Sequence, residues 1–584
     1  MIKMTGAKVL TTVMEQAGIS VVSGIPGHTI SNFALEVGDN PWFKTILPRH
    51  EATAAFAADA YFRVSGRLMA AFTHAFPGAG NALTAVANAY ADYSSMLFVA
   101  GNTASASMGR GGYQELSRQI NDDLPQLIRP TVKRLWQPRS AADLAHHAVS
   151  ALRVATSGRP GPVALCVSQE IWDQEVEVPS AQLAQFAFDA RPRPDARSVE
   201  RAVAMLASAK RPVILAGNGV NLGRARAQLR ILVEQLQVPV ATTASGKGCF
   251  PEDHPLSVGV AGWTGTATAN EATRSADLIL VLGARLAEAT ASSCTPNATF
   301  SPQCRIIQAD ICMSGIANTY PVEEALVGDL RAALEDLATA QKGSKNPDLS
   351  AWFAHLQEVR QAWEQTALAS QAPGSTGAIG TGAVVQALRR SVEGPINLVN
   401  DCGKHHKWIV QQFEARADDY IVSSMGGAAM GIGLAGAVGA ALARPEARTV
   451  AWVGDGGLAM SLSALPTLAE YRLPITLVVI DDAAYGVVRN TQMAQVGRTS
   501  YALFDGSGAN PDYRLDFKTV AQGCGIPGRT VTDPAELAAA FQWAAQQNGP
   551  CVLDIRSEIT STHPSGGGTL RALDDTSRSL VWKN

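Results

Sequence analysis

Gly454-Asp455-Gly456-Gly457 is the stretch that decides the fold, together with Asp482, which lies 27 residues after Asp455. Each acid follows a short apolar run that reads as a buried strand. Between the runs, Leu, Met and Ala recur at helical spacing, so the segment predicts a βαβ unit. The parallel strands of such a unit point the same way. We therefore expect Asp455 and Asp482 side by side at the carboxyl edge of a sheet, where doubly wound sheets bind ligands.

This edge has the chemistry of a metal and diphosphate site. Gly456 and Gly457 leave the N-terminus of the following helix open, and its free N–H groups and dipole favour a phosphate. Hard carboxylate oxygens beside a diphosphate suit Mg²⁺, which shares its near-octahedral shell with phosphate oxygens. A lone Gly-Asp-Gly is common in turns, so the second acid at a matching strand end carries the prediction.

A second segment begins an Ala-rich helix at Glu51, directly after Arg49-His50. On its own, Glu51 is explained as a favourable acid in the first turn of a helix. Together the two segments resemble the signature of thiamine-diphosphate enzymes, and the chain resembles their acetolactate synthase-like branch. In that family the carboxylate hydrogen-bonds the pyrimidine N1′ and drives the aminopyrimidine toward its imino form, which takes the proton from the thiazolium C2. The resemblance implies this catalytic role for Glu51, with burial raising its proton affinity.

The resemblance also implies the metal ligands, which are the carboxylates of Asp455 and Asp482 and the backbone carbonyl of Ala484. The chain departs from the family at residues 481–482, where the usual Asn-Asn pair is Asp-Asp. An aspartate at 482 can still bind Mg²⁺. It adds negative charge beside a diphosphate, however, so a lysine or the metal must compensate.

Two further segments resemble cofactor-binding segments of the family. Residues 401–408 correspond to an Asp-Val-Gly-Gln-His-Gln-Met-Trp segment whose Gly, Gln and His contact the diphosphate, and the lysine at 404 offers a compensating charge. Residues 424–431 correspond to the segment that supplies a bulky residue under the bent cofactor and a carbonyl for its 4′-amino group. Met430 either holds this bend or simply fills the core, which methionine does well. The implied cofactor contacts are Gly403, Lys404, His405, Ala428 (through its carbonyl), Met430, Gly456 and Gly457.

Three more side chains are expected to act on the substrate. His28 lies in a Gly/Pro turn after a strand-like run, His74 precedes a loop that approaches the cofactor in the family, and Gln114 resembles a site-facing glutamine. A loop histidine is often only a surface group, but two in cofactor-facing loops favour proton shuttling. Thr491 stands where anabolic acetolactate synthases usually carry a tryptophan that favours 2-oxobutyrate, which argues against that specific enzyme.

The length of 584 residues exceeds what one core supports, and the patterns predict an α/β protein of three doubly wound parallel-sheet domains. We expect a pyrimidine-binding domain with the catalytic glutamate at 1–182, a central domain at 196–340, and a diphosphate- and metal-binding domain at 375–558. The C-terminal tail, 559–584, shows no clear periodicity. It is either a flap over the site or a frayed end.

The central domain leaves its cofactor open. Its turn at 217–223 nearly matches a dinucleotide fingerprint but has one residue too many, so a plain strand-to-helix turn is favoured. Members of the family hold FAD in this domain, an ADP-like group, or nothing, and the sequence does not decide among them.

Composition excludes several classes of protein. A net charge of −3 and a pI near 6.4 leave no basic stripe, so no nucleic-acid partner is expected. No signal-peptide pattern and no run of about 18 apolar residues occurs, which predicts a cytoplasmic protein with no membrane contact. Eight cysteines without a CxxC suggest neither a zinc site nor a disulfide framework.

The expected activity is that of a thiamine-diphosphate-dependent C–C bond lyase or carboligase acting on a 2-oxo acid or related ketone. One alternative is a 2-oxo acid decarboxylase or 2-hydroxyacyl lyase. Another, in a different class, is a non-catalytic cofactor-binding subunit, which would lose the glutamate or a metal ligand. Glu51 and the metal site lie in different domains, and in the resembling family such a site forms between subunits. A homodimer or homotetramer with thiamine diphosphate, Mg²⁺ and a small-molecule substrate is therefore expected.

Overall fold

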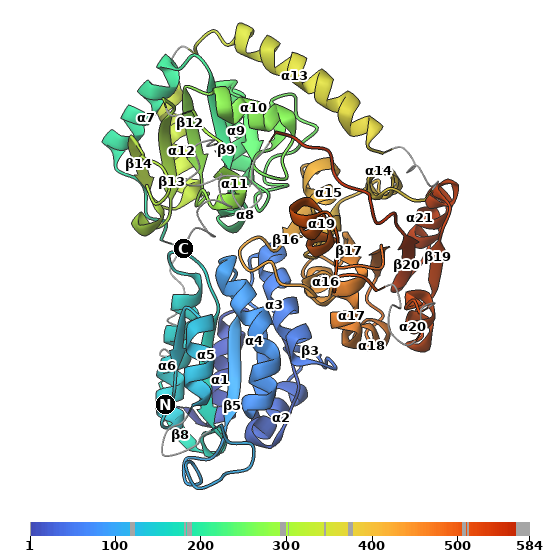
Figure 1. The fold of residues 1–584 in the computed structure, drawn as a ribbon. Coiled ribbons are helices and arrows are strands. Elements are labelled where there is room, and N and C mark those ends of the chain that lie inside the picture. Colours follow the sequence, from blue (N-terminus) through green and yellow to red (C-terminus); the bar gives the residue numbers. More distant parts are fainter. Residues whose placement is uncertain are drawn as a thin grey trace.

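The computed structural model describes residues 2–116, 123–179, 183, 190–291, 299–301, 303–343, 346–371, 378–504, 510 and 513–567. They form three six-stranded sheets, each flanked by helices (Figure 1). Within each sheet all neighbouring strands are parallel. The expected α/β class with three doubly wound parallel sheets is confirmed.

The N-terminal sheet has the strand order β3-β2-β4-β5-β7-β6, and apolar clusters fill both of its faces. A short antiparallel pair of β1 (Ile2–Thr5) and β8 (Glu175–Val178) lies beside it. The strands are β2 (Val21–Gly24), β3 (Lys44–Ile46), β4 (Ala70–His74), β5 (Leu97–Asn102), β6 (Arg134–Trp136) and β7 (Val163–Ser168). The helices are α1 (Gly6–Gln16), α2 (Ser31–Asp39), α3 (Glu51–Ser65), α4 (Ala75–Ala91), α5 (Leu124–Ile128) and α6 (Ala141–Thr156).

The central sheet has the order β11-β10-β9-β12-β13-β14. Its turn at Gly217 joins β9, which ends at Ala216, to α8, which starts at Asn218. The strands are β9 (Pro212–Ala216), β10 (Val240–Thr242), β11 (Ser257–Val260), β12 (Leu278–Leu282), β13 (Arg305–Asp310) and β14 (Glu324–Val327). The helices are α7 (Ala196–Ser208), α8 (Asn218–Leu222), α9 (Arg226–Leu236), α10 (Ala267–Ser275), α11 (Glu288–Ala291) and α12 (Leu330–Gln341).

The C-terminal sheet has the order β16-β15-β17-β18-β20-β19, and the long helix α13 (Ser350–Ala369) leads to it from the central sheet (Figure 1). The strands are β15 (Ile396–Asn400), β16 (Tyr420–Ser423), β17 (Arg448–Gly454), β18 (Ile475–Asp481), β19 (Gly528–Val531) and β20 (Cys551–Arg556). The helices are α14 (Thr381–Ser391), α15 (Lys404–Gln412), α16 (Ile432–Ala443), α17 (Asp455–Ser461), α18 (Leu465–Glu470), α19 (Gly486–Val496), α20 (Phe517–Gly523) and α21 (Leu537–Ala545).

The predicted βαβ unit is present, but its crossover is broken. Residues 458–471, read as one helix, instead form α17, a short 3₁₀ turn and α18. Pro466 lies in the first turn of α18, where its missing N–H is harmless, and it cannot continue a helix from the preceding turn. The unit still returns to β18 beside β17, so its two acids reach the same edge.

The N-terminal and C-terminal domains are joined by a contact of small residues between α3 and α16, which lie against each other in Figure 1. α16 is rich in glycine and alanine and is almost wholly buried. A Cβ on Gly439 would overlap the Ala57 carbonyl, and one on Gly436 would lie 3.3 Å from the Ala60 Cβ. The absence of side chains therefore lets the two helix backbones approach closely, and one apolar cluster spans both domains.

The start of the C-terminal tail is fastened rather than frayed. Gln411 Nε2 donates to the Pro564 carbonyl at 2.9 Å, and Asn270 Nδ2 donates to the Gly566 carbonyl at 2.8 Å. Residues 559–567 thus cross from the C-terminal domain to the central one, while 568–584 lie outside the described residues. The sheets span 21–168, 212–327 and 396–556, and the predicted domain boundaries stay predictions. None of the described helices combines the length and hydropathy that a membrane span requires.

Candidate functional site

Asp455 and Asp482 lie together because their strands are neighbours. β17 ends at Gly454, opposite Ile480 of β18, and both acids are buried, with 5% and 7% of their surface exposed. The Ala484 N–H donates to Asp455 Oδ2 at 3.2 Å. The Asp455 carboxylate therefore touches the loop that carries the other two predicted metal ligands.

The two carboxylates form an acidic site that favours a hard cation. Burial raises the pKa of Asp455, and the charges of Asp482 and Asp481 raise it further. Burial also raises the pKa of Asp482, although the Lys404 ammonium opposes this shift. Among the described residues, no group of three or more His, Cys, Asp or Glu side chains forms a metal site by itself. Mg²⁺ fits these donors when oxygens of a diphosphate or of water complete its shell.

Lys404 supplies the charge that the Asp-Asp pair requires. Its Nζ lies 2.6 Å from Asp482 Oδ2, and the two side chains are only 5% and 6% exposed. Nζ also donates to the carbonyl oxygens of Ile559 and Glu558, at 2.9 and 3.4 Å. All three ammonium protons thus have protein acceptors. Lys404 therefore neutralises Asp482, so donating hydrogen bonds to a diphosphate cannot be its sole role.

Asp481 has cations of its own, which sequence reasoning missed. Arg514 Nη2 lies 3.0 Å from Asp481 Oδ1, and Arg556 forms a second ion pair with the same carboxylate. Each acid of the pair is therefore matched by a basic side chain, which removes the penalty of a lone buried charge. The departure from Asn-Asn was the signal in the sequence that extra cations are needed. Only the fold shows which arginines form ion pairs with Asp481.

The imidazole of His405 fits a diphosphate-binding role. It lies between the backbones of Gly403 and Gly454, where a Cβ on either glycine would collide with the ring. Burial lowers the pKa of His405 to about 3, so the ring is neutral. Its Nε2 is buried and has no hydrogen-bond partner among the described residues. Such an unmet group costs about 1–3 kcal/mol, which a phosphate oxygen would offset by accepting from Nε2 in the tautomer that carries the ring proton there.

The segment 424–431 holds two predicted cofactor contacts in unusual geometry. A Cβ on Gly456 would lie 3.4 Å from Met430 Cε, so this methionine packs directly over the Gly-Asp-Gly-Gly turn. Ala428 has φ 50°, a left-handed conformation that costs a residue with a Cβ about 1–2 kcal/mol. The Gly431 N–H donates to both oxygens of Asp401, at 2.9 and 3.1 Å. The segment is therefore tied to β15 at its far end.

The three predicted substrate-facing side chains come together in the N-terminal domain. His74 Nε2 lies 2.6 Å from Gln114 Oε1, and the His74 and His28 ring centroids are 4.6 Å apart. Thr29 and Tyr113, which sequence reasoning missed, complete the cluster: Thr29 Oγ1 lies 2.9 Å from His74 Nδ1, and the Tyr113 ring 5.4 Å from that of His28. Burial and the neighbouring His74 both lower the pKa of His28, which keeps it neutral.

Glu51 begins α3 and is only half-buried, less than the sequence argument required. Its Oε2 accepts a hydrogen bond from Asn81 Nδ2 at 2.9 Å, and a Cβ on Gly78 would lie 3.1 Å from Oε1. Among the described residues, its hydrogen-bond partner is thus Asn81 and not a group of the Asp455 edge. One chain alone leaves this carboxylate open on one side.

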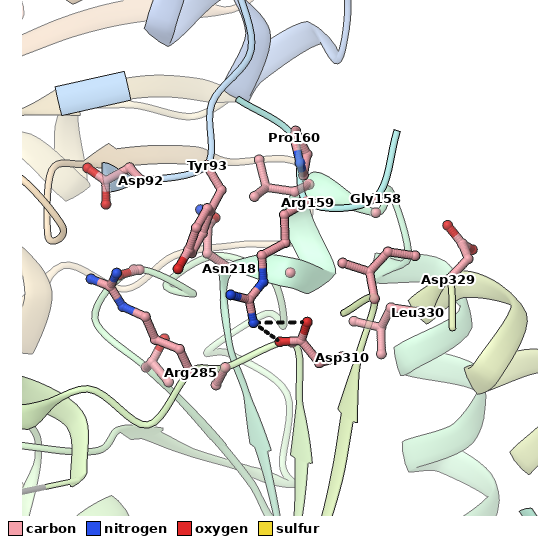
Figure 2. Close-up of a pocket in the computed structure, with 18 of the residues that line it drawn as sticks. Asp92, Tyr93, Gly158, Arg159, Pro160, Asn218, Arg285, Asp310, Asp329 and Leu330 are labelled. Atoms are coloured by element: carbon pink, nitrogen blue, oxygen red, sulfur yellow. Dashed lines mark hydrogen bonds and ion pairs between the residues drawn. The ribbon is translucent and has the colours of Figure 1, made fainter. Parts of the chain in front are cut away.

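A large cavity of about 710 Å³ lies between the central and N-terminal domains. Its lining includes Tyr93, Arg159, Asn218, Arg285 and Asp310 (Figure 2). Arg159 reaches across from the N-terminal domain to Asp310 at the end of β13, with Nη2 3.2 Å from both carboxylate oxygens. The glycine-bearing turn after β9 contributes Asn218 to the same wall. The cavity therefore lies at the turn for which the sequence did not decide among FAD, an ADP-like group and no cofactor.

The Lys404–Asp482 pair makes a direct prediction for stability. Lys404→Gln leaves Asp482 buried beside Asp455 without its cation and should cost about 3 kcal/mol of unfolding free energy. Asp482→Asn should cost less, because the Lys404 ammonium keeps its two carbonyl acceptors. The double variant should recover most of the loss. Denaturant unfolding of cofactor-free protein measures all three, and strictly additive losses would contradict the coupling.

A Mg²⁺ titration of thiamine diphosphate binding provides the second measurement on the same variants. Lys404→Gln should lower the Mg²⁺ concentration needed for half-saturation, because the edge then carries one more uncompensated negative charge and attracts the cation more strongly. Asp482→Asn should leave that concentration nearer the wild-type value. An unchanged titration in Lys404→Gln would show that the ammonium has no influence on metal binding at the sheet edge that carries Asp455 and Asp482, here called the metal edge.

Comparison with known proteins matches all three domains. Residues 4–122 match the N-terminal thiamine-pyrophosphate-binding domain of thiamine pyrophosphate enzymes, 199–337 their central domain, and 401–555 their C-terminal thiamine-pyrophosphate-binding domain. The chain is 28% identical to a probable acetolactate synthase large subunit of Methanocaldococcus jannaschii, over 97% of this chain and 94% of that protein. It is 30% identical to acetolactate synthase large subunits of Parasynechococcus marenigrum and Corynebacterium glutamicum, over 94% and 95% of this chain and 87% of each relative. The chain therefore belongs to the thiamine-diphosphate-dependent enzymes, in their acetolactate synthase-like family.

Proposed function

We propose that the protein is a carboligase that takes pyruvate or a closely related 2-oxo acid as donor and joins the resulting fragment to an acceptor carbonyl. The relatives that cover nearly the whole chain are acetolactate synthases by name, which supports this choice of donor. The observation that carries the proposal is the metal edge, where Asp455 and Asp482 are buried and Gly454 packs against His405, a histidine with an unmet Nε2. Bound thiamine diphosphate supplies the nucleophilic carbon that adds to the donor carbonyl.

The residues of the metal edge have distinct tasks in this proposal. Asp455, Asp482 and the Ala484 carbonyl hold Mg²⁺, while Lys404 keeps the Asp482 charge from repelling the diphosphate. Other predicted contacts belong to the cofactor itself. Gly403, His405, Gly456 and Gly457 bind the diphosphate, Met430 supports the bend, and the Ala428 carbonyl accepts from the amino group.

Glu51 holds a proton for the pyrimidine ring, and we propose that it does so across a subunit boundary. The half-buried carboxylate, held by Asn81, is consistent with a second chain covering the open side. A homodimer is then the smallest active species, and a homotetramer is a pair of such dimers.

A second candidate activity is decarboxylation or lysis with protonation in place of carboligation. The observation that favours it is the pair of histidines at 28 and 74, whose rings are in contact and can deliver a proton to a carbon beside them. Thr491, in place of a tryptophan, removes one reason to expect 2-oxobutyrate as acceptor.

The cavity between the domains supports a proposal for a second cofactor. Arg285 brings positive charge to its wall beside the Arg159–Asp310 ion pair, and the Asn218 turn lies there at the end of a strand. An adenine-containing diphosphate such as FAD or ADP fits this combination of a glycine turn, arginines and a volume of about 710 Å³.

Product analysis separates the two candidate activities. Pyruvate alone, and pyruvate with an added aldehyde, should both yield coupled hydroxyketone or hydroxy-oxo acid products if the enzyme is a carboligase. Release of free aldehyde as the dominant product would instead support decarboxylation. Carbon-13 NMR of the reaction mixture distinguishes these outcomes in one experiment.

Glu51→Gln should lower turnover by at least about 100-fold, because general acid–base contributions of this kind are worth about 10²–10⁴. The fold should persist, since Gln can still accept from Asn81. Glu36→Gln, which changes an acid of the same domain bonded to Lys8, is the matched control and should keep full activity. Near-normal turnover of Glu51→Gln, with cofactor bound, would remove the catalytic assignment.

Mixing two inactive variants tests the subunit boundary. Glu51→Gln and Asp455→Asn chains, allowed to exchange, should regain about a quarter of wild-type activity, because half of the dimers are mixed and each mixed dimer holds one intact site. If Glu51 and Asp455 served the same site within one chain, mixing would restore nothing.

Mass spectrometry of the compounds released on denaturing the purified protein tests the cavity. An adenine-containing diphosphate at about one per chain is expected, and Arg285→Ala should lower its occupancy because the variant loses a cation from the wall. Protein that retains thiamine diphosphate but releases no adenine compound would rule out this second cofactor.

A further inference from the structure

Four buried polar residues at the ends of α3 and α4 form one network inside the domain interface. They are Asp59, Arg63, Asn88 and Asp92, with exposed fractions of 0%, 7%, 2% and 6%. Arg63 Nε lies 2.6 Å from Asp59 Oδ1, and its Nη2 lies 3.1 Å from Asp92 Oδ2. Asn88 Nδ2 donates to Asp59 Oδ2 at 3.0 Å. The guanidinium therefore pairs with both carboxylates, and Asp59 holds the amide of Asn88 in one orientation.

The remaining hydrogen-bonding groups of this network all point to the segment 423–429 of the C-terminal domain. Arg63 Nη1 donates to the Ser423 carbonyl at 3.0 Å, and the Gly426 N–H donates to Asp92 Oδ1 at 2.7 Å. The Ala429 N–H donates to Asn88 Oδ1 at 3.3 Å. Backbone groups on both sides of Ala428 thus find their partners in another domain.

Ser424 adds a side-chain contact from the same segment. Its hydroxyl lies 3.2 Å from Asp92 Oδ2 and forms a hydrogen bond with Asn88 Oδ1. One hydroxyl hydrogen serves these two acceptors, which brings both network residues onto Ser424.

Two glycines let the segment lie directly on α4. A Cβ on Gly426 would overlap the Ala91 carbonyl, and a Cβ on Gly427 would lie 2.7 Å from Asn88 Oδ1. The segment lies between the end of β16 and the start of α16 and has no strand or helix ladder of its own. Its conformation is therefore set by what it touches, which is α4.

The network has a consequence for the cofactor because the same segment leads to Ala428 and Met430. Ala428 is in the left-handed region, a conformation that persists only where its surroundings over-determine it. The hydrogen bonds at Gly426 and Ala429 flank this residue. Gly431, two residues after Ala429, is fixed by the hydrogen bond from its N–H to Asp401.

We propose that Asn88 and Asp92, held by Asp59 and Arg63, are positioning residues that clamp residues 424–429 so that the Ala428 carbonyl and Met430 are set for the cofactor. This inference rests on the proposed function, since it assigns those two groups to thiamine diphosphate. A purely structural role for the same contacts would stabilise the domain interface without any effect on cofactor affinity, and the two roles differ in what they predict.

The test compares two serine variants of cofactor-free protein. Ser424→Ala removes the hydroxyl that bonds to Asn88 and Asp92. Ser94→Ala is the matched control, because Ser94 is equally buried and donates to the Asp59 carbonyl at 3.0 Å but does not touch the segment. Calorimetric titration with thiamine diphosphate at saturating Mg²⁺ gives the affinity, and thermal unfolding of the same samples gives the stability.

Ser424→Ala should weaken thiamine diphosphate binding by about 5- to 20-fold, the range expected when one buried hydrogen-bonding group is lost from a binding conformation. Asp92→Asn should weaken it further, because it also breaks the ion pair with Arg63. Ser94→Ala should leave the affinity within about 2-fold of wild type. It should lower the unfolding temperature about as much as Ser424→Ala does, because each variant loses one buried hydroxyl. The circular dichroism of the bound cofactor should change in Ser424→Ala and not in Ser94→Ala.

Gly427→Ala provides a second variant that removes no polar group. Its new methyl would press on Asn88 Oδ1 and lift the segment, so it should reproduce the loss of affinity in a folded protein even if Asp92→Asn does not fold. Wild-type affinity in Ser424→Ala and Gly427→Ala, with lowered unfolding temperature, would overturn the clamp and leave the proposed function intact. Absence of thiamine diphosphate binding by the wild-type protein would overturn both.

Discussion

Repulsion between two buried carboxylates is the constraint on which the rest of the site depends. Parallel pairing of β17 with β18 brings Asp455 and Asp482 to one edge, where neither is solvated. Such a pair is unfavourable unless cations are supplied. The protein supplies one in its own side chain, the Lys404 ammonium, and the Mg²⁺ proposed above would supply the other at Asp455. The aspartate at 482 and Lys404, which begins α15 after the strand β15 next to β17, thus compensate each other's charge.

The fold gives each half of the cofactor site a different kind of support. The metal edge is built on strand ends, so its geometry follows from backbone hydrogen bonding within one sheet. The segment around Ala428 has no such scaffold and borrows its partners from α4, while α3 and α16 hold the two domains at the short distance this requires. Rigidity at the second half therefore depends on the domain interface, and glycines at 426, 427 and 439 are its points of closest approach.

Local pattern predicted the sheets and the meeting of Asp455 and Asp482 at one edge, because strand ends and helix starts are properties of short segments. The apolar runs before Asp455 and Asp482 predicted neighbouring strands, and the structure has them in register. It failed where the deciding contact is remote in sequence. Arg514 and Arg556 pair with Asp481 from different parts of the chain, and Asn88 reaches a segment more than 300 residues away. The half-exposed Glu51 is another remote case, since the group proposed to cover it belongs to a second chain. The crossover that was read as one helix was instead broken by a local signal, Pro466.

The ion pair between Lys404 and Asp482 also constrains how this sequence can change. Either residue alone, exchanged for the neutral side chain usual in the family, leaves a formal charge inside a region that is about 95% shielded from solvent. The two positions are thus expected to change together, as a covarying pair, although 78 residues separate them along the chain. A homologue with asparagine at the position of Asp482 should carry a neutral residue at that of Lys404. The same rule limits engineering, since a cofactor site transplanted from a relative must bring both residues at once.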